Sequence, residues 1–177
     1  MIGETSGLSH VSIPGLGIAK PAVFPQIPKR PLWKVPGAFF FEPTRIATAM
    51  EESAITHSVE VRVEAYFLEE QSDAEKGLFT FAYRVKLKNL GQDTVQLLRR
   101  HWVITDSTGH VRHVKGDGVV GEQPVLQPGQ SYEYVSGSRL ESPIGSMEGT
   151  YQMVNQKGES FEVKIPQFTL AVPSVLN

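Results

Sequence analysis

The chain has 177 residues, of which 40% are hydrophobic and 20% are charged, a composition that supports a folded core and argues against disorder throughout. Its net charge of −2 lacks the strongly basic balance of a dedicated nucleic-acid-binding protein. The absence of cysteine excludes disulfides, thiolate catalysis and cysteine-ligated zinc or iron–sulfur centres.

No apolar run approaches the ~18 residues that a membrane-spanning helix requires. The first residues show neither the apolar core of a secretory signal nor the arginine- and serine-rich composition of a transit peptide. We therefore expect a protein of the cytoplasm, with an organelle matrix as the alternative, and no contact with a membrane.

Residues 1–43 contain seven of the twelve prolines. Proline lacks the amide that helices and central strands need, so this segment is expected to form an extended arm. The arm carries Trp33, Phe39, Phe40 and Phe41, and a free linker would not normally expose such large apolar side chains. We expect these aromatic residues to pack on the chain's own domain or to bind a partner protein.

Residues 44–54, TRIATAMEESA, lack proline and glycine and place apolar side chains at helical spacing. The pattern predicts one or two turns of helix that join the arm to the domain. The arm is therefore assigned to residues 1–55 and the folded domain to residues 56–177.

From Thr56 onward, apolar and polar residues alternate, most regularly in residues 59–65 and 79–87. Alternate side chains of a strand point to opposite faces, so these runs predict antiparallel strands with one buried face. Turn signals such as Asp106-Ser107-Thr108-Gly109 separate them. Further strands are expected at residues 95–105, 110–115, 118–126, 131–136, 147–154, 159–165 and 167–172. This pattern predicts an all-β sandwich or barrel.

Five segments, in one order, resemble the ApaG family over nearly all of residues 56–177. They are YRVKLKNLG (83–91), VQLLRRHWVITDSTG (95–109), VKGDGVVGEQPVLQPG (114–129), YEYVSGSRLESPIGSMEGTYQM (132–153) and FEVKIPQFTLAVPSVL (161–176). The resemblance implies a fibronectin type III-like, immunoglobulin-like antiparallel β-sandwich. It also implies a turn at Ser136-Gly137-Ser138.

The functions that the resemblance implies are diverse. Bacterial ApaG proteins are associated with cobalt resistance and magnesium efflux. Similar domains in some F-box proteins and in polymerase delta-interacting protein 2 look like protein-interaction modules. Residues 1–55 lie outside the resemblance, which weakens a direct transfer of the bacterial role.

The segment Gly116-Asp117-Gly118-Val119-Val120-Gly121 fits the GxGxxG pattern of dinucleotide-binding proteins. That pattern must open a helix, and the prolines at 124 and 128 preclude one here. Backbone amides near Gly116, Gly118 and Gly121 could still hold a phosphate or nucleotide without a helix. The alternative is a structural turn of positive-φ glycines.

The histidines predict no metal site. His110 and His113 are three residues apart, which places them on opposite faces of a strand. His101 precedes Trp102 on another strand and could reach a neighbouring carboxylate. No cluster of acidic residues has the spacing of a hard-cation site.

Arg99 and Arg100 are the candidate partner-binding cations of the domain. With His101, they could join Lys86, Lys88, Arg112, His113 and Lys115 in a basic stripe on one sheet. The alternative is a solvated outer face.

No nucleophile motif or paired carboxylates stand out, so we expect no catalytic residues and no cofactor. The large side chains of Trp102, Tyr134, Tyr151 and Phe168 are assigned to the core. The sequence thus favours a non-enzymatic module that binds another protein, without sequence-specific contact to nucleic acid. A phosphate, nucleotide or divalent-cation role, a structural subunit of a larger complex and a homodimer remain alternatives.

Overall fold

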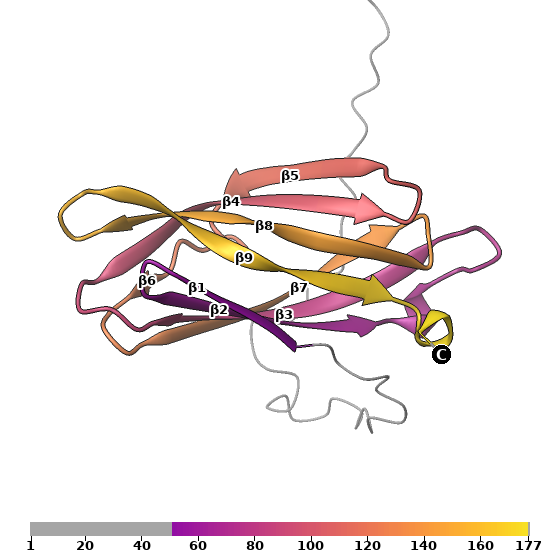
Figure 1. Cartoon of the computed structure of the whole chain (residues 1–177), viewed down its shortest axis with the longest axis horizontal. Helices are drawn as coiled ribbons and strands as arrows, with labels where there is room; N and C mark the ends of the chain where they lie inside the picture. The colour runs from indigo at the N-terminus through magenta and orange to yellow at the C-terminus, as the bar shows by residue number, and fades with distance from the viewer. Residues whose placement is uncertain (1–50, 177) are drawn as a thin grey trace, which may run out of the picture.

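The computed structural model describes residues 51–176, and it shows two antiparallel sheets packed face to face (Figure 1). The strands are β1 (Glu51–Thr56), β2 (Val59–Phe67), β3 (Phe79–Asn89), β4 (Val95–Asp106), β5 (Val111–Asp117), β6 (Val125–Leu126), β7 (Ser131–Leu140), β8 (Ile144–Asn155) and β9 (Ser160–Ala171). Short 3₁₀ turns follow β2 and β9. One sheet has the order β1-β2-β3-β7, and the other has the order β5-β4-β8-β9 with β6 paired to β4. The expected all-β, fibronectin type III-like sandwich is confirmed.

The alternating runs form the strands that their periodicity predicts. In β2 the side chains of Val59, Val61 and Val63 are buried, and in β3 those of Phe81, Tyr83, Val85 and Leu87 are buried. The residues between them face solvent or the sheet margin. Among the described residues, no helix is long and apolar enough to cross a membrane.

The helix predicted over residues 44–54 is wrong where the structure describes it. Residues 51–54 belong to β1, which pairs with β2 from Glu51 opposite Glu64 to Thr56 opposite Val59. Pairing with β2 therefore overrides the local helix preference of the segment. The first strand also begins five residues before the boundary assigned from sequence. Residues 44–50 lie outside the described part of the chain.

Three strand predictions need correction. Only Val125–Leu126 of the expected strand at 118–126 is extended, because a tight turn occupies residues 118–122. The turn expected at Ser136-Gly137-Ser138 instead lies within β7, which pairs continuously with β3. The two strands expected on either side of Pro166 form one strand, β9.

Pro166 is tolerated within β9 because it lies in a β-bulge on an edge strand. Met147 pairs with Phe168 and Gly149 pairs with Ile165, so one residue of β8 opposes two residues of β9. The bulge absorbs a residue that cannot donate a ladder hydrogen bond. The proline in the sequence therefore marks a local irregularity rather than a strand boundary.

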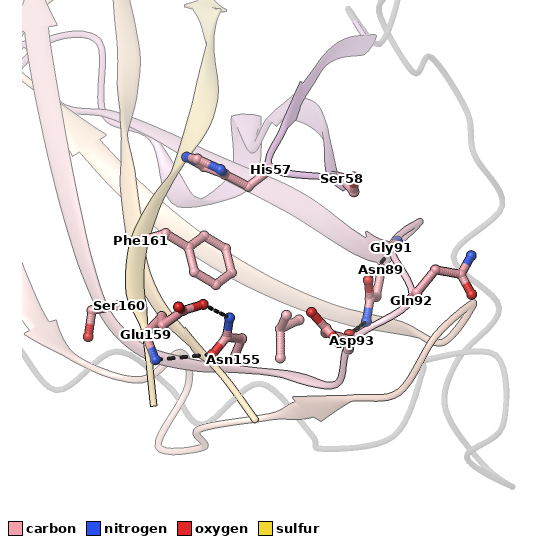
Figure 2. A pocket seen from close by; sticks show the side chains of 11 residues that line it. His57, Ser58, Asn89, Gly91, Gln92, Asp93, Asn155, Glu159, Ser160 and Phe161 are labelled. Atoms are coloured by element: carbon pink, nitrogen blue, oxygen red, sulfur yellow. Dashed lines mark hydrogen bonds between the residues drawn. The ribbon is translucent and has the colours of Figure 1, made fainter. Parts of the chain in front are cut away.

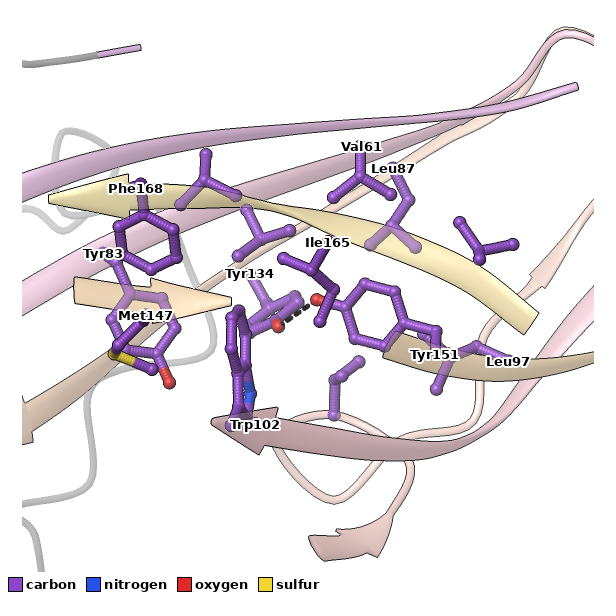
Figure 3. Close-up of a cluster of buried hydrophobic side chains, with 14 of the residues drawn as sticks. Val61, Tyr83, Leu87, Leu97, Trp102, Tyr134, Met147, Tyr151, Ile165 and Phe168 are labelled. Atoms are coloured by element: carbon purple, nitrogen blue, oxygen red, sulfur yellow. Dashed lines mark hydrogen bonds between the residues drawn. The ribbon is translucent and has the colours of Figure 1, made fainter. Parts of the chain in front are cut away.

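Trp102 lies at the centre of the core and contacts aromatic residues from both sheets (Figure 3). Its ring centroid is 5.4 Å from that of Tyr83 in the facing sheet, and 6.3 Å and 6.0 Å from those of Tyr151 and Phe168 in its own. A hydrogen bond of 2.6 Å joins the hydroxyl of Tyr134 in β7 to that of Tyr151 in β8. The assignment of these large residues to the core is confirmed.

The tyrosines make stability sensitive to alkaline pH. Burial raises the pKa of Tyr134 and Tyr151. Burial and a hydrogen bond to a carboxylate, that of Glu64 for Tyr66 and that of Glu122 for Tyr132, raise the pKa of these two tyrosines to about 12. The folded chain therefore holds these protons more tightly than the unfolded chain, whose tyrosines titrate near pH ~10.

We predict that the free energy of unfolding falls as pH rises through about 10 to 12 and is unaffected by these groups below that range. The slope is about 1.4 kcal/mol per pH unit for each linked tyrosine. Urea denaturation at a series of pH values, with phenolate absorbance recorded in parallel, measures it. The double variant Tyr134→Phe/Tyr151→Phe should show a shallower slope. Ordinary phenolate titration near pH ~10 in the folded chain would contradict the prediction.

Candidate functional site

The strand β5 is an edge strand with none of its seven residues buried. Its partner is β4, with Val103 opposite His113 and Trp102 opposite Val114. One side chain of β5 bonds to the facing sheet: the guanidinium of Arg112 donates to the hydroxyl of Ser138 at 3.4 Å and to the carbonyl of Arg139 at 3.1 Å, both in β7. The open side of β5 is therefore available to another chain as far as the described residues show.

Two hydrogen bonds fix which backbone groups of β5 face outward. The amide of Asp106 donates to the carbonyl of His110 at one end of the hairpin, and the amide of Gly118 donates to the carbonyl of Leu98 at the other. Hydrogen-bonded and non-bonded pairs alternate along an antiparallel ladder. The groups that point away from β4 thus belong to four residues. They are Val111, His113, Lys115 and Asp117.

The basic stripe expected on one sheet is wrong, because its members lie on two sheets. Lys86 and Lys88 belong to β3, whereas the other cations of the proposed stripe belong to β4 and β5 in the facing sheet. On the outer face of the β1-β2-β3-β7 sheet, Arg62 forms an ion pair with Glu60, and Arg84 forms one with Glu64. Positive and negative charges therefore alternate on that face. The other basic side chains of the expected stripe lie along β4 and β5.

The glycine-rich segment closes a tight hairpin after β5. The amide of Val119 donates to the carbonyl of Glu122 at 2.8 Å, and the amide of Glu122 donates back at 2.9 Å. The two central residues, Val120 and Gly121, have φ values of 51° and 79°. Positive φ at both positions is typical of a type I′ turn. At Gly118 a Cβ atom would lie 2.1 Å from the Glu122 carbonyl oxygen. The backbone of Glu122 thus occupies the space that any side chain at position 118 would need.

This geometry favours the structural interpretation of the glycine motif. The amides of Gly118, Val119 and Glu122 are already donated to backbone carbonyls, which leaves few donors for a phosphate. The carboxylates of Asp117 and Glu122 flank the turn and would oppose an anion. Gly116 has a separate role: a Cβ atom there would lie 3.0 Å from the guanidinium of Arg100.

The two adjacent arginines have different surroundings. Arg100 faces the same side of β4 as Trp102, and its guanidinium donates to the carbonyls of Asp117 at 3.0 Å and Gly118 at 2.7 Å. Arg99 faces outward and forms an exposed ion pair with Asp117 at 3.1 Å. Arg100 therefore anchors the glycine turn, and Arg99 is the one of the two placed to meet a partner.

A polar pocket of about 360 Å³ lies at one end of the sandwich (Figure 2). Three connections form it: the β1–β2 turn, the β3–β4 loop and the β8–β9 hairpin. The lining residues are His57, Ser58, Asn89, Gly91, Gln92, Asp93, Val95, Asn155, Glu159, Ser160 and Phe161. They include two carboxylates and no lysine or arginine, so the pocket suits a cationic group better than an anion.

Buried and turn-forming amides hold the loops of this pocket in place. Asn89 is 1% exposed, and its side chain donates to the carbonyls of Asp93 and Leu126 and accepts from the amide of Gly91. Asn155 accepts two amides of the β8–β9 hairpin and donates to the carboxylate of Glu159. Sequence reasoning missed this pocket, because its lining comes from turns far apart in the chain.

The structure brings together some predicted site residues and leaves others apart. Gly116, Gly118, Gly121, Arg99 and Arg100 gather around the start of the glycine turn. The predicted aromatic contacts of the arm lie outside the described residues; they are Trp33, Phe39, Phe40 and Phe41. Within residues 51–176, no group of three or more histidine or acidic side chains is placed to hold a metal ion.

Comparisons with known proteins identify the domain. The model of the ApaG domain matches residues 69–155. Protein ApaG of Acidithiobacillus ferrooxidans is 52% identical over 128 residues, which cover 72% of this chain and all of that protein. Protein ApaG of Paramagnetospirillum magneticum is 53% identical over 121 residues, covering 68% of this chain and 93% of that protein. The crystal structure of the putative ApaA protein from Bordetella pertussis has a TM-score of 0.64 and 46% identity, and covers 65% of this chain and 94% of that one.

If the glycine turn is structural, its two positive-φ glycines should respond differently to alanine. Gly118→Ala should lower the free energy of unfolding by roughly 3 kcal/mol, because it adds a clash with backbone to the cost of positive φ. Gly121→Ala should cost only about 1 kcal/mol, since nothing lies within 4 Å of its Cβ position. Urea denaturation of both variants measures the difference. Equal losses would contradict the clash expected at Gly118.

Proposed function

The chain belongs to the ApaG family, and we propose that it serves as a non-catalytic protein-interaction module that receives an extended segment of a partner protein along β5. The observation that carries this proposal is the exposed β5 edge, with four residues whose backbone groups point away from β4. Of these groups, the carbonyl of Asp117 already accepts from Arg100. An incoming strand gains main-chain hydrogen bonds from such an edge. Charged side chains such as those of Arg112 and Lys115 keep an edge strand from pairing with copies of itself, so this edge suits a partner of opposite charge.

The charge of β5 indicates the kind of segment that fits. Arg112, His113 and Lys115 lie on the strand, Arg99 lies beside it on β4, and Asp117 is paired with Arg99. An acidic extended segment would complement this surface. A second copy of β5 would bring like charges together, because the two Lys115 side chains would be diagonal neighbours in an antiparallel pair centred on Val114. We therefore favour a different protein over self-association.

Two observations support a role without catalysis. Every buried side-chain nitrogen and oxygen in the described residues has a hydrogen-bond partner. Catalytic groups are often buried polar atoms whose partners arrive with the substrate. The titratable groups with the largest rises in pKa, Tyr134 and Tyr151, bond to each other in the core and do not line the polar end pocket.

The other roles suggested by the sequence have less structural support than the exposed β5 edge. The amides of Gly118, Val119 and Glu122 donate to backbone carbonyls, which leaves few donors for a phosphate or nucleotide. The cation-homeostasis role rests on the family resemblance. Membership of a larger complex is compatible with the proposal, since a subunit would use the same edge.

Proline substitution tests the proposed edge directly. Lys115→Pro removes one outward amide without removing a bond to β4, and Lys115→Ala removes the same charge but keeps the amide. Random peptides without a bias in composition are displayed on phage and selected against the full-length chain. We predict that selected peptides are acidic, shift the amide resonances of β5 and bind Lys115→Pro at least about tenfold more weakly than Lys115→Ala.

Val111→Pro and Val111→Ala form a second matched pair at the other end of the strand. They provide an independent comparison if Lys115→Pro lowers the melting temperature. Selection of no binder would overturn the proposal. Equal affinity for the proline and alanine variants, or resonance shifts centred on the polar end pocket, would also overturn it.

A further inference from the structure

His101 and His113 form a close pair on the outer face of the β4–β5 hairpin. His113 lies opposite Val103 and His101 lies opposite Lys115, so the two histidines are diagonal neighbours on one face. Nε2 of His101 is 2.9 Å from Nδ1 of His113, and the rings are inclined by 27° with centroids 5.2 Å apart. His113 is exposed and His101 is half-buried, so solvent reaches the pair.

The nitrogen separation matches the spacing of two ligands on one metal ion. Imidazole nitrogens bind first-row transition ions at about 2.0–2.1 Å. Two such nitrogens at a right angle are ~2.9 Å apart, whereas a tetrahedral angle separates them by ~3.4 Å. The two nitrogens share a hydrogen bond in this arrangement, and a metal ion would take the place of the shared proton. Because His113 is exposed, its ring can turn so that both lone pairs face the ion. Imidazole sites bind Cu²⁺ more tightly than Ni²⁺ or Zn²⁺, as the general order of divalent affinities requires.

We propose that His101 and His113 form a two-imidazole site for a late first-row transition ion, with Cu²⁺ bound more tightly than Ni²⁺ or Zn²⁺. Only these two side chains converge within the described residues, so water occupies the remaining coordination positions. This site is independent of the proposed peptide-binding role, although His113 lies on the same strand.

Neighbouring charges give the proposal a signature that a structural histidine pair would lack. The ammonium of Lys115 and the carboxylate of Glu162 both act electrostatically on His101. A bound dication is repelled by the first and attracted by the second. Lys115→Gln should therefore tighten metal binding by about twofold to fivefold, and Glu162→Gln should weaken it by a similar factor, since both charges are exposed to solvent.

The test uses the full-length chain without an affinity tag, because a histidine tag would bind the same ions. Cu²⁺ and Ni²⁺ alone are titrated and followed by calorimetry and by paramagnetic broadening of imidazole resonances. His101→Gln and His113→Gln should each lower Cu²⁺ affinity at least about tenfold, because each removes one of two ligands. His110→Gln is the matched control, since this exposed histidine contacts Asp106 instead of the pair.

The outcomes are distinct. Selective broadening of His101 and His113, with the stated order of variants, supports the site. Broadening centred on another histidine, affinity that is equal in His101→Gln and His110→Gln, or tighter binding of Zn²⁺ than of Cu²⁺ would each overturn it. Circular dichroism confirms that the variants retain the fold. The proline variants of β5 keep both imidazoles, so failure of the peptide-binding proposal leaves this test unaffected.

Discussion

The packing of Trp102 between the two sheets is the constraint on which the rest of the domain depends. Its ring contacts Tyr83 across the interface and Tyr151 and Phe168 within its own sheet. The nearby hydroxyl pair of Tyr134 and Tyr151 satisfies two polar atoms that would otherwise be costly to bury. This core sets the distance between the two sheets. It therefore determines which strands are covered by the facing sheet and which extend beyond its edge.

The exposure of β5 follows from that arrangement. Inward-facing positions of β4 are covered by the facing sheet, but the next strand, β5, meets it mainly through Arg112. Arg100 occupies the margin between core and edge, where its stem faces inward and its guanidinium holds the carbonyls of the glycine turn. The same side chain thus closes the core and fixes the end of the exposed strand.

Period-two alternation made the sheet class predictable, because burial of one face is a local property of a strand. The buried valines of β2 and the large core residues follow directly from it. The pairing of residues 51–54 with β2, the continuity of β9 through Pro166 and the polar end pocket depend on distant neighbours, so local pattern misassigned or missed them. The order of the sequence motifs identifies the family because it follows the order of the strands. Strand order alone does not show which side chains come together at a site.

The glycine segment and the histidine pair show why spacing alone identifies chemistry poorly in a sheet. GxGxxG spacing matches a phosphate loop, but here the amides are donated to Glu122, Val119 and Leu98. His110 and His113 are close in sequence and do not bond to each other, whereas His101 and His113 are twelve apart and meet at 2.9 Å. A one-residue shift in the β4–β5 register would place His113 on the opposite face of the sheet from His101. The hairpin bond between Asp106 and His110 sets that register, and it therefore decides whether a pair of imidazoles exists at all.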